Sequence, residues 1–292
     1  MKHAIVAALA GMVVGAFALA TGGEPERPRY EPRAVAEGGV AWVTIGDFGT
    51  GGSEQRNLAN DMCNLHDTVD FDHVVTTGDN VYPSGDPDDF KDAFFDPYDC
   101  LFDADVSFRA VPGNHDAVTN GGKPELDEPR FGMDGHRYRW RLGPVRFLMF
   151  DSNQTGRRAM RWIRTRLRDA SGAPWTVVVM HHPVYSGGAG HGSTLGFAER
   201  FARRFARRGV DLVLHGHDHV YSRARKRGVT YLVTGGGGAG LYECQEPLPK
   251  PVKECESEHH FLDLRATKKT LSATAVAIDG TVLEEVDIRP NE

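Results

Sequence analysis

The chain has 292 residues, of which 40% are hydrophobic and 25% are charged. This composition is that of an ordinary soluble globular protein, and the length allows one large domain or two small ones. The formal net charge is −6, whereas nucleic-acid-binding proteins usually have a basic excess. We therefore expect no nucleic-acid partner. A small anionic substrate is not excluded, because metal ions can reverse the sign of the local charge.

The first 20 residues have the pattern of a secretory signal. A short basic beginning is followed by an uninterrupted apolar stretch, 4–20, which ends in small residues. We interpret residues 1–20 as a signal peptide, so that the protein would be secreted, periplasmic or displayed on the cell surface. The alternative is a retained N-terminal anchor, and only in that case do we expect contact with a membrane.

The next segment, residues 21–39, is rich in Pro, Glu, Arg and Gly and has no apolar period. Such a composition predicts a flexible linker. We expect one folded domain over residues 40–292.

Four cysteines follow the predicted signal, and none of them forms a CxxC pair, which makes a structural zinc site improbable. An even number in an exported chain favours disulfides, with three possible connectivities. We favour Cys63–Cys100 and Cys244–Cys255 because each pair closes a local loop. Four buried free thiols are the alternative if the chain is not exported.

Along the chain, apolar β-branched runs alternate with loops and with segments of helical period. The expected strands are 40–45, 73–77, 106–111, 176–180 and 210–214, with a β-hairpin at 137–142 and 145–150. The expected helices are 53–67, 157–170 and 195–208. An antiparallel section over 261–288 ends the chain. This order implies a layered α/β domain with at least one mixed sheet.

Residues with metal-binding side chains follow five of the expected strands, at the carboxyl ends where ligands collect in open α/β sheets. They are Asp47, Asp79 with Tyr82, Asn114 with His115, His181, and His217 with His219. Each cluster alone is explained as well by turn residues or a core histidine. Together they offer three imidazoles, two carboxylates, one carboxamide and one phenol. This set suits two cations that share a carboxylate.

With these motifs the sequence resembles the calcineurin-like metallophosphoesterases and, within them, the purple acid phosphatases of the small, tartrate-resistant type. The motifs are Gly46-Asp47-Phe48-Gly49, Gly78-Asp79-Asn80-Val81-Tyr82, Gly113-Asn114-His115-Asp116, Val178-Val179-Met180-His181 and Gly216-His217-Asp218-His219. The five motifs indicate the superfamily, and Tyr82 indicates the purple enzymes. The resemblance implies a four-layer α/β/β/α sandwich, in which two mixed sheets are flanked by helices. A dinuclear metal site would lie at the C-terminal tips of the strands.

The resemblance also implies how the metal ligands divide. One site would be formed by Asp47, Tyr82 and His219, and would hold ferric iron. The second would be formed by Asn114, His181 and His217, and would hold divalent iron, zinc or manganese. Asp79 would bridge the two ions.

The implied activity is that of an exported acid phosphatase, a phosphoric monoester hydrolase in which a metal-bound hydroxide attacks phosphorus in line. His115 and His191 are the catalytic candidates, because the family has outer-sphere histidines in these places. For His191 the alternative is an exposed loop histidine. We expect small phosphorylated substrates and a monomer.

Two other functions remain open at the level of the sequence. A phosphodiesterase or nucleotide hydrolase could use the same dinuclear centre, because the loops that control access of the leaving group have no clear pattern. A non-catalytic, metal-binding surface protein on this scaffold is the alternative from a different class.

Overall fold

The computed structural model of the protein describes residues 27–169 and 172–291. The predicted signal peptide, residues 1–20, lies outside the described residues. No helix in the described part of the chain is both long enough and apolar enough to cross a membrane.

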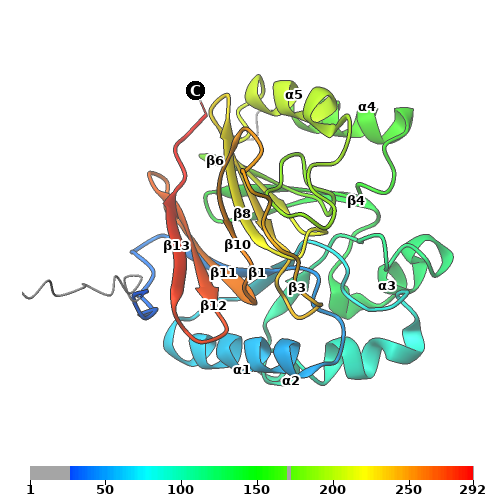
Figure 1. Ribbon diagram of the computed structural model, residues 1–292, viewed down its shortest axis with the longest axis vertical. Coiled ribbons are helices and arrows are strands. Elements are labelled where there is room, and N and C mark those ends of the chain that lie inside the picture. Colours follow the sequence, from blue (N-terminus) through cyan, green and yellow to red (C-terminus); the bar gives the residue numbers. More distant parts are fainter. Residues whose placement is uncertain (1–26, 170–171, 292) are drawn as a thin grey trace, which may run out of the picture.

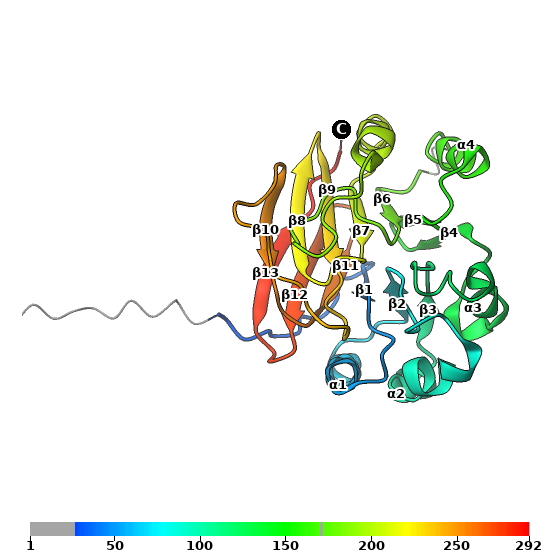
Figure 2. The same cartoon turned by 45° about the vertical axis from the view of Figure 1, so that its right-hand side comes forward.

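Two mixed sheets pack face to face (Figures 1 and 2). The first has six strands in the order β13-β12-β11-β1-β2-β3, and the second has seven in the order β10-β8-β9-β7-β6-β5-β4. Strands β1, β2 and β3 are parallel, and so are β5, β6, β7 and β9. The antiparallel pairs therefore lie toward one side of the first sheet and at both edges of the second.

The strands of the first sheet are β1 (Val40–Ile45), β2 (His73–Thr76), β3 (Ser107–Arg109), β11 (His260–Ala266), β12 (Leu271–Ala277) and β13 (Val282–Asp287). The strands of the second are β4 (Arg137–Leu142), β5 (Val145–Phe150), β6 (Trp175–Val179), β7 (Leu212–His215), β8 (Tyr221–Lys226), β9 (Val229–Thr234) and β10 (Val252–Glu256).

Helices cover the outer faces of both sheets. The α-helices are α1 (Ser53–Thr68), α2 (Asp99–Asp103), α3 (Lys123–Asp127), α4 (Arg157–Arg166) and α5 (Arg203–Ala206). Short 3₁₀ or π turns are η1 (Pro87–Asp89), η2 (Lys91–Phe95), η3 (Asn120–Gly122), η4 (Pro129–Phe131) and η5 (Ala198–Ala202). In Figure 1, α1 and α2 lie at the bottom, whereas α4 and α5 lie at the top.

Three apolar layers separate the two sheets from each other and from the helices on their outer faces. Alternate side chains of β1 point to opposite faces, so Val43 packs toward α1 while Trp42 packs between the sheets. Trp42 meets Phe147 of the second sheet edge to face, with ring centroids 5.3 Å apart. A third layer lies between the second sheet and helices α4 and α5. The predicted four-layer α/β/β/α sandwich is confirmed.

The expected helix over 195–208 begins later than predicted. Gly196 has a φ of +75°, which is outside the helical region, and Leu195 before it is 96% exposed. The helical turns therefore begin at η5. Phe197, Phe201 and Phe205, which are spaced four residues apart in this segment, all face the core and are buried.

Part of the expected linker packs against the domain. Tyr30 N donates to Gly280 O over 2.9 Å, and Val282 N donates to Pro28 O over 2.8 Å. The Tyr30 hydroxyl also donates to the carboxylate of Asp263. These contacts place the beginning of the packed chain before residue 40, and the predicted limits of the signal, linker and catalytic domain remain proposals.

Both favoured disulfides are present. Cys63–Cys100 joins α1 to α2, and Cys244–Cys255 joins β10 to the segment before it. The two loops differ in length, with sequence separations of 37 and 11 residues. In the chain-entropy model, the longer loop restricts the unfolded chain more strongly.

We predict that the two disulfides stabilise the protein unequally. Replacing Cys63 and Cys100 by Ala should lower the free energy of unfolding by about 4 kcal/mol, and replacing Cys244 and Cys255 by about 3 kcal/mol. Urea unfolding of the two double variants and of the wild type under non-reducing conditions measures this order. The reverse order would contradict the entropic account.

Candidate metal centre

The predicted site residues come from loops at the carboxyl ends of β1, β2, β6 and β7 and from the segment after β3. Because β1 and β2 are parallel and in register, their tips lie side by side. Asp47 N donates to Gly78 O over 3.0 Å, and Phe48 N donates to Asp79 O over 3.3 Å. In the second sheet, Gly216 N donates to His181 O over 3.0 Å. Backbone hydrogen bonds thus hold the loops of each sheet in pairs.

Three of the site residues have a left-handed backbone although they are not glycines. Asp47, Asp79 and His217 have φ angles of 56°, 52° and 71°. Such conformations cost free energy and gather at functional sites. A hydrogen bond offsets part of this cost, because both oxygens of the Asp47 carboxylate accept the His217 amide over 2.9 Å.

Glycines allow these loops to approach one another. A Cβ atom on Gly113 would lie 2.0 Å from Asp79 Oδ1, and one on Gly216 would lie 2.3 Å from Asp47 Oδ2. The glycine run at 235–238 has the same role, since a Cβ on Gly237 would lie 2.3 Å from Gly46 O. The lack of side chains at these glycines therefore allows close packing around the site.

The seven predicted ligand side chains form one connected cluster with two halves. In the first half, Tyr82 Oη lies 3.2 Å from His219 Nε2, and His219 Nε2 lies 3.5 Å from Asp47 Oδ1. In the second half, Asn114 Oδ1 lies 3.0 Å from His181 Nε2 and 2.7 Å from His217 Nδ1.

Asp79 touches both halves through a single oxygen. Its Oδ2 lies 3.1 Å from Tyr82 Oη and 3.4 Å from His181 Nε2. One ligand atom each from Asp47, Asp79 and His181 also lie within 4.8 Å of one another, in a buried place. This geometry is what a shared carboxylate between two cations requires.

The tautomers of two histidines add a chemical argument. His181 Nδ1 faces the Thr77 carbonyl over 2.9 Å, and His219 Nδ1 faces the Gly240 carbonyl over 2.6 Å. A carbonyl only accepts hydrogen bonds, so Nδ1 has the proton in both rings. In the neutral rings the Nε2 lone pairs are therefore directed at other site atoms, as is usual for metal-binding histidines with an outer hydrogen-bond partner.

Without bound cations, the buried ionisable side chains of the cluster are in an unfavourable electrostatic environment. Burial opposes a charge on His181, but Asp79 and Asp47 outweigh it and raise its pKa to about 9. Burial and the charge of His181 lower the pKa of neighbouring His217 to about 2. Burial and the carboxylates of Asp47 and Asp79 raise the pKa of Tyr82 above its usual range. Cations among these oxygens and nitrogens would relieve this conflict, so the donor set fits a dinuclear metal centre.

Both predicted catalytic histidines lie beside the cluster. His115 N donates to Asp79 Oδ1 over 2.9 Å, and the His115 ring packs against Tyr82 with centroids 4.4 Å apart. His191 is exposed, and its ring stacks on His217 with centroids 4.2 Å apart. His191 is thus an exposed loop histidine and also a neighbour of the site.

Three further residues, which the sequence did not single out, support the site. Asp116 is buried and accepts the backbone amides of Asn80, Val81 and Gly113. It therefore ties the loop of Asp79 to the loop of Asn114. The feature of the sequence that could have identified Asp116 is its place directly after Asn114 and His115 in the motif.

Asp218 and Tyr242 support the other side of the site. Asp218 is buried, accepts the His191 amide over 3.0 Å and also accepts the Ser186 hydroxyl. The Tyr242 ring stacks on His219 with centroids 4.4 Å apart, and its hydroxyl lies 3.3 Å from His191 Nε2. Asp218 stands between two ligand histidines in the sequence, whereas no local pattern marks Tyr242.

The chain is a two-sheet sandwich that brings carboxylate, amide and imidazole side chains together at its strand tips. This arrangement is typical of the dinuclear metal hydrolases. The model of the calcineurin-like phosphoesterase family matches residues 43–221, which is more than half of the chain. The chain belongs to this family, and the resemblance deduced from its five motifs is confirmed.

Purple acid phosphatases are among its relatives. Purple acid phosphatase 17 of Arabidopsis thaliana is 27% identical over 314 residues, a match that covers 92% of this chain and 89% of the relative. The fold is shared with purple acid phosphatase PPD1 of yellow lupin, with 19% identity and a TM-score of 0.73. That match covers 89% of this chain but only 55% of the lupin protein.

The same fold also occurs in a protein described in other terms. GAP50, the anchor in the inner membrane complex of Plasmodium, has a TM-score of 0.76 and 16% identity, and the match covers 87% of this chain and 90% of GAP50. The fold alone therefore does not determine the function.

We predict that Asp116→Asn weakens metal binding, because the amide cannot accept all the hydrogen bonds that hold the two loops. The expected loss is about 10- to 100-fold in metal affinity, as for other outer partners of metal ligands. Titration of the metal-stripped variant with zinc measures it.

The matched control is Asp211→Asn. Asp211 is also buried, and it accepts the amides of Thr176 and Asn291 over 2.8 Å each. It lies at the beginning of β7, away from the ligand loops, so its loss should lower stability without changing zinc affinity. Equal losses of zinc affinity in both variants would contradict a specific role for Asp116.

Proposed function

We propose that the protein is an exported, metal-dependent phosphomonoesterase with the activity of an acid phosphatase. The observation that carries the proposal is the cluster of seven ligand side chains in two halves, with one oxygen of Asp79 touching both. The family of the chain and its purple acid phosphatase relatives support a phosphoric monoester hydrolase. The two disulfides are consistent with an oxidising compartment.

In this proposal Asp47, Tyr82 and His219 would hold ferric iron, and Asn114, His181 and His217 would hold a divalent ion of iron, zinc or manganese. Asp79 would contact both ions. When bound, the metal pair supplies positive charge for the phosphate group and acidifies water near neutral pH. The hard phenol and carboxylate oxygens of the first half suit the ferric ion, and the imidazoles of the second suit borderline divalent ions.

The residues of the chain itself would orient the substrate and move protons. His115 Nδ1 faces the Pro83 carbonyl over 2.7 Å, so this nitrogen has the proton and Nε2 is free to face a bound ester. We assign to His115, as an imidazolium with a second proton on Nε2, the protonation of the leaving oxygen, which leaves a neutral ring with its proton on Nδ1. His191, held by the Asp218 carboxylate at its amide and by Tyr242 at its ring, would contact the phosphate group.

A phosphodiesterase or nucleotide hydrolase on the same centre remains the alternative within the enzymes. Comparing hydrolysis of p-nitrophenyl phosphate and bis-p-nitrophenyl phosphate distinguishes them, and we expect the monoester to react faster. The non-enzymatic alternative is a metal-binding surface protein. The Plasmodium protein with the same fold is described as an anchor. If that alternative is correct, the protein should hydrolyse neither compound.

We predict that the purified protein absorbs in the visible region and that Tyr82→Phe abolishes this band. The reason is that charge transfer to ferric iron needs the phenolate oxygen, which the variant lacks. Visible spectra, recorded together with iron content and phosphatase activity, measure the effect. The matched control is Tyr242→Phe, since this ring also contacts His219 but its hydroxyl is directed at His191.

The possible results test three parts of the proposal separately: the role of Tyr82, the identity of the metals and the phosphatase activity. A Tyr82→Phe protein with the full band would contradict the assignment of Tyr82 to iron. A colourless wild type that contains two zinc or manganese ions and hydrolyses the monoester would remove the iron and keep the phosphatase. A metal-loaded wild type without hydrolysis would overturn the proposed function.

We also predict that the effect of His115→Asn depends on the leaving group. An alkyl phosphate needs a proton on its leaving oxygen, so its hydrolysis should slow by about 10² to 10⁴-fold. Hydrolysis of p-nitrophenyl phosphate should slow much less, because p-nitrophenolate leaves without a proton. The kcat values for glycerol phosphate and p-nitrophenyl phosphate measure the difference, and an equal loss for both would contradict the assigned role.

A further inference from the structure

The two helical segments that cover the outer face of the second sheet are rich in arginine. Residues 157–168 and 200–208 contain eleven of the 34 lysines and arginines of the chain, and all eleven are arginines. They are Arg157, Arg158, Arg161, Arg164, Arg166, Arg168, Arg200, Arg203, Arg204, Arg207 and Arg208. We call this surface the arginine face. It is a concentrated positive region on a protein whose net charge is −6.

The arginine face is almost free of internal charge pairing. Among residues 27–169 and 172–291, no carboxylate lies within salt-bridge distance of any of its eleven guanidinium groups. The acidic residues nearest in sequence are Asp169, which pairs with Arg139, and the exposed Glu199. Unpaired charges of one sign on one surface produce a positive potential that attracts counter-ions, so this concentration of free charge favours an external anion.

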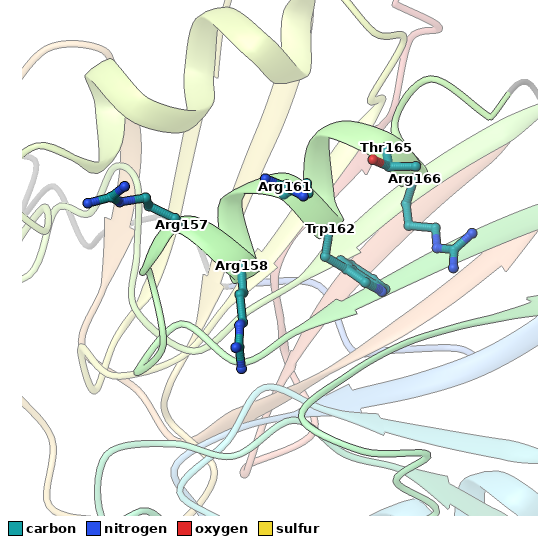
Figure 3. Close-up of a pocket in the computed structure, with 6 residues that line it drawn as sticks. All are labelled: Arg157, Arg158, Arg161, Trp162, Thr165 and Arg166. Carbon is teal, nitrogen blue, oxygen red and sulfur yellow. The ribbon is translucent and has the colours of Figure 1, made fainter.

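The face is hollowed rather than flat. A groove of about 410 Å³ runs between α4 and the end of α5, and Arg164, Arg168, Arg204, Arg207 and Arg208 line it with Leu167. A second hollow of about 420 Å³ lies on the other flank of α4. Figure 3 shows Arg158, Trp162 and Arg166 there, extending to the same side of the helix.

From these observations we propose that the arginine face binds a flexible polyanionic chain with repeated phosphate or sulfate groups. The exclusive use of arginine favours phosphate or sulfate, because the planar guanidinium binds two of their oxygens at once. The arginines line a groove between two helices, and an extended chain can follow such a groove, whereas a flat membrane would contact only its rim. The groove also lacks an aromatic side chain on which a nucleic-acid base could stack.

The face is separate from the candidate metal centre but begins near it. Strand β5 is parallel to β6, so its carboxyl end lies at the edge of the sheet that contains His181. Helix α4 begins after that end, and Arg200 Nη1 is joined to the same connection by a 3.2 Å hydrogen bond to Thr155 Oγ1. Binding to the arginine face does not require phosphatase activity, so the two proposals can fail independently.

Fluorescence anisotropy of fluorescein-labelled dextran sulfate tests the proposal. A sulfated polymer is a suitable probe because the proposed phosphatase does not hydrolyse it. The test variant is Arg168→Glu/Arg207→Glu/Arg208→Glu, whose three side chains are exposed and line the groove. The matched control is Lys253→Glu/Lys268→Glu/Lys269→Glu, which makes the same change in net charge at exposed positions away from the helices.

We expect the wild type to bind the polymer at low salt and long-chain polyphosphate to compete. The arginine variant should bind about tenfold more weakly, and the slope of log affinity against log salt should fall by about 2. The lysine control should stay within about twofold of the wild type. Thermal unfolding checks that each variant is folded, and the same three arginines changed to Gln provide a milder variant.

Several results would overturn the proposal. The wild type could fail to bind the polymer at low salt, or the lysine control could lose as much affinity as the arginine variant. Sedimentation of the protein with phosphatidylglycerol vesicles, without binding to dextran sulfate, would assign the face to a membrane. Tighter binding to a single-stranded DNA of equal charge would assign it to nucleic acid.

Discussion

The structure depends on one electrostatic constraint, which is the convergence of carboxylates, imidazoles and a phenol in a buried place. Asp79 Oδ2 faces both Tyr82 and His181, and the Nδ1 atoms of His181 and His219 face backbone carbonyls, so that their Nε2 atoms face the site. Asp47, Asp79 and His181 are almost completely shielded from water, so cations are the simplest way to make the arrangement stable. The left-handed backbones of Asp47, Asp79 and His217 also cost free energy. The protein tolerates this cost at the place where the site side chains converge.

The rest of the domain keeps that point fixed. The loops of Asp47, Asp79, His181 and His217 leave strands that are largely buried on both faces. A continuous apolar layer joins the two sheets. Buried carboxylates in the loops then hold the loops together, with Asp116 in the segment after β3 and Asp218 in the segment after β7. Rigid strands with outer partners for the ligands are how proteins hold metal-binding side chains in place.

The charge of the molecule is also divided by function. Carboxylates gather at the metal centre, where they would meet cations, while the arginines of α4 and α5 gather on the outer face of the second sheet. A net charge of −6 conceals this separation. The net charge therefore describes neither region, and the sign of the ion that each would attract follows from its local composition.

The sequence by itself predicted the order of strands and loops and the seven candidate ligand positions, because these features depend on short-range patterns. It left three disulfide connectivities open and favoured the one with local loops, which the structure contains. Tertiary structure decided which ligands meet, since Asn114 reaches His217 across 103 residues and Tyr242 reaches His219 with no local signal. It also decided where the helix after Gly196 begins and that two distant arginine segments share a groove. Periodicity encodes the face of a strand or helix, but contacts between layers arise only when the apolar faces pack together.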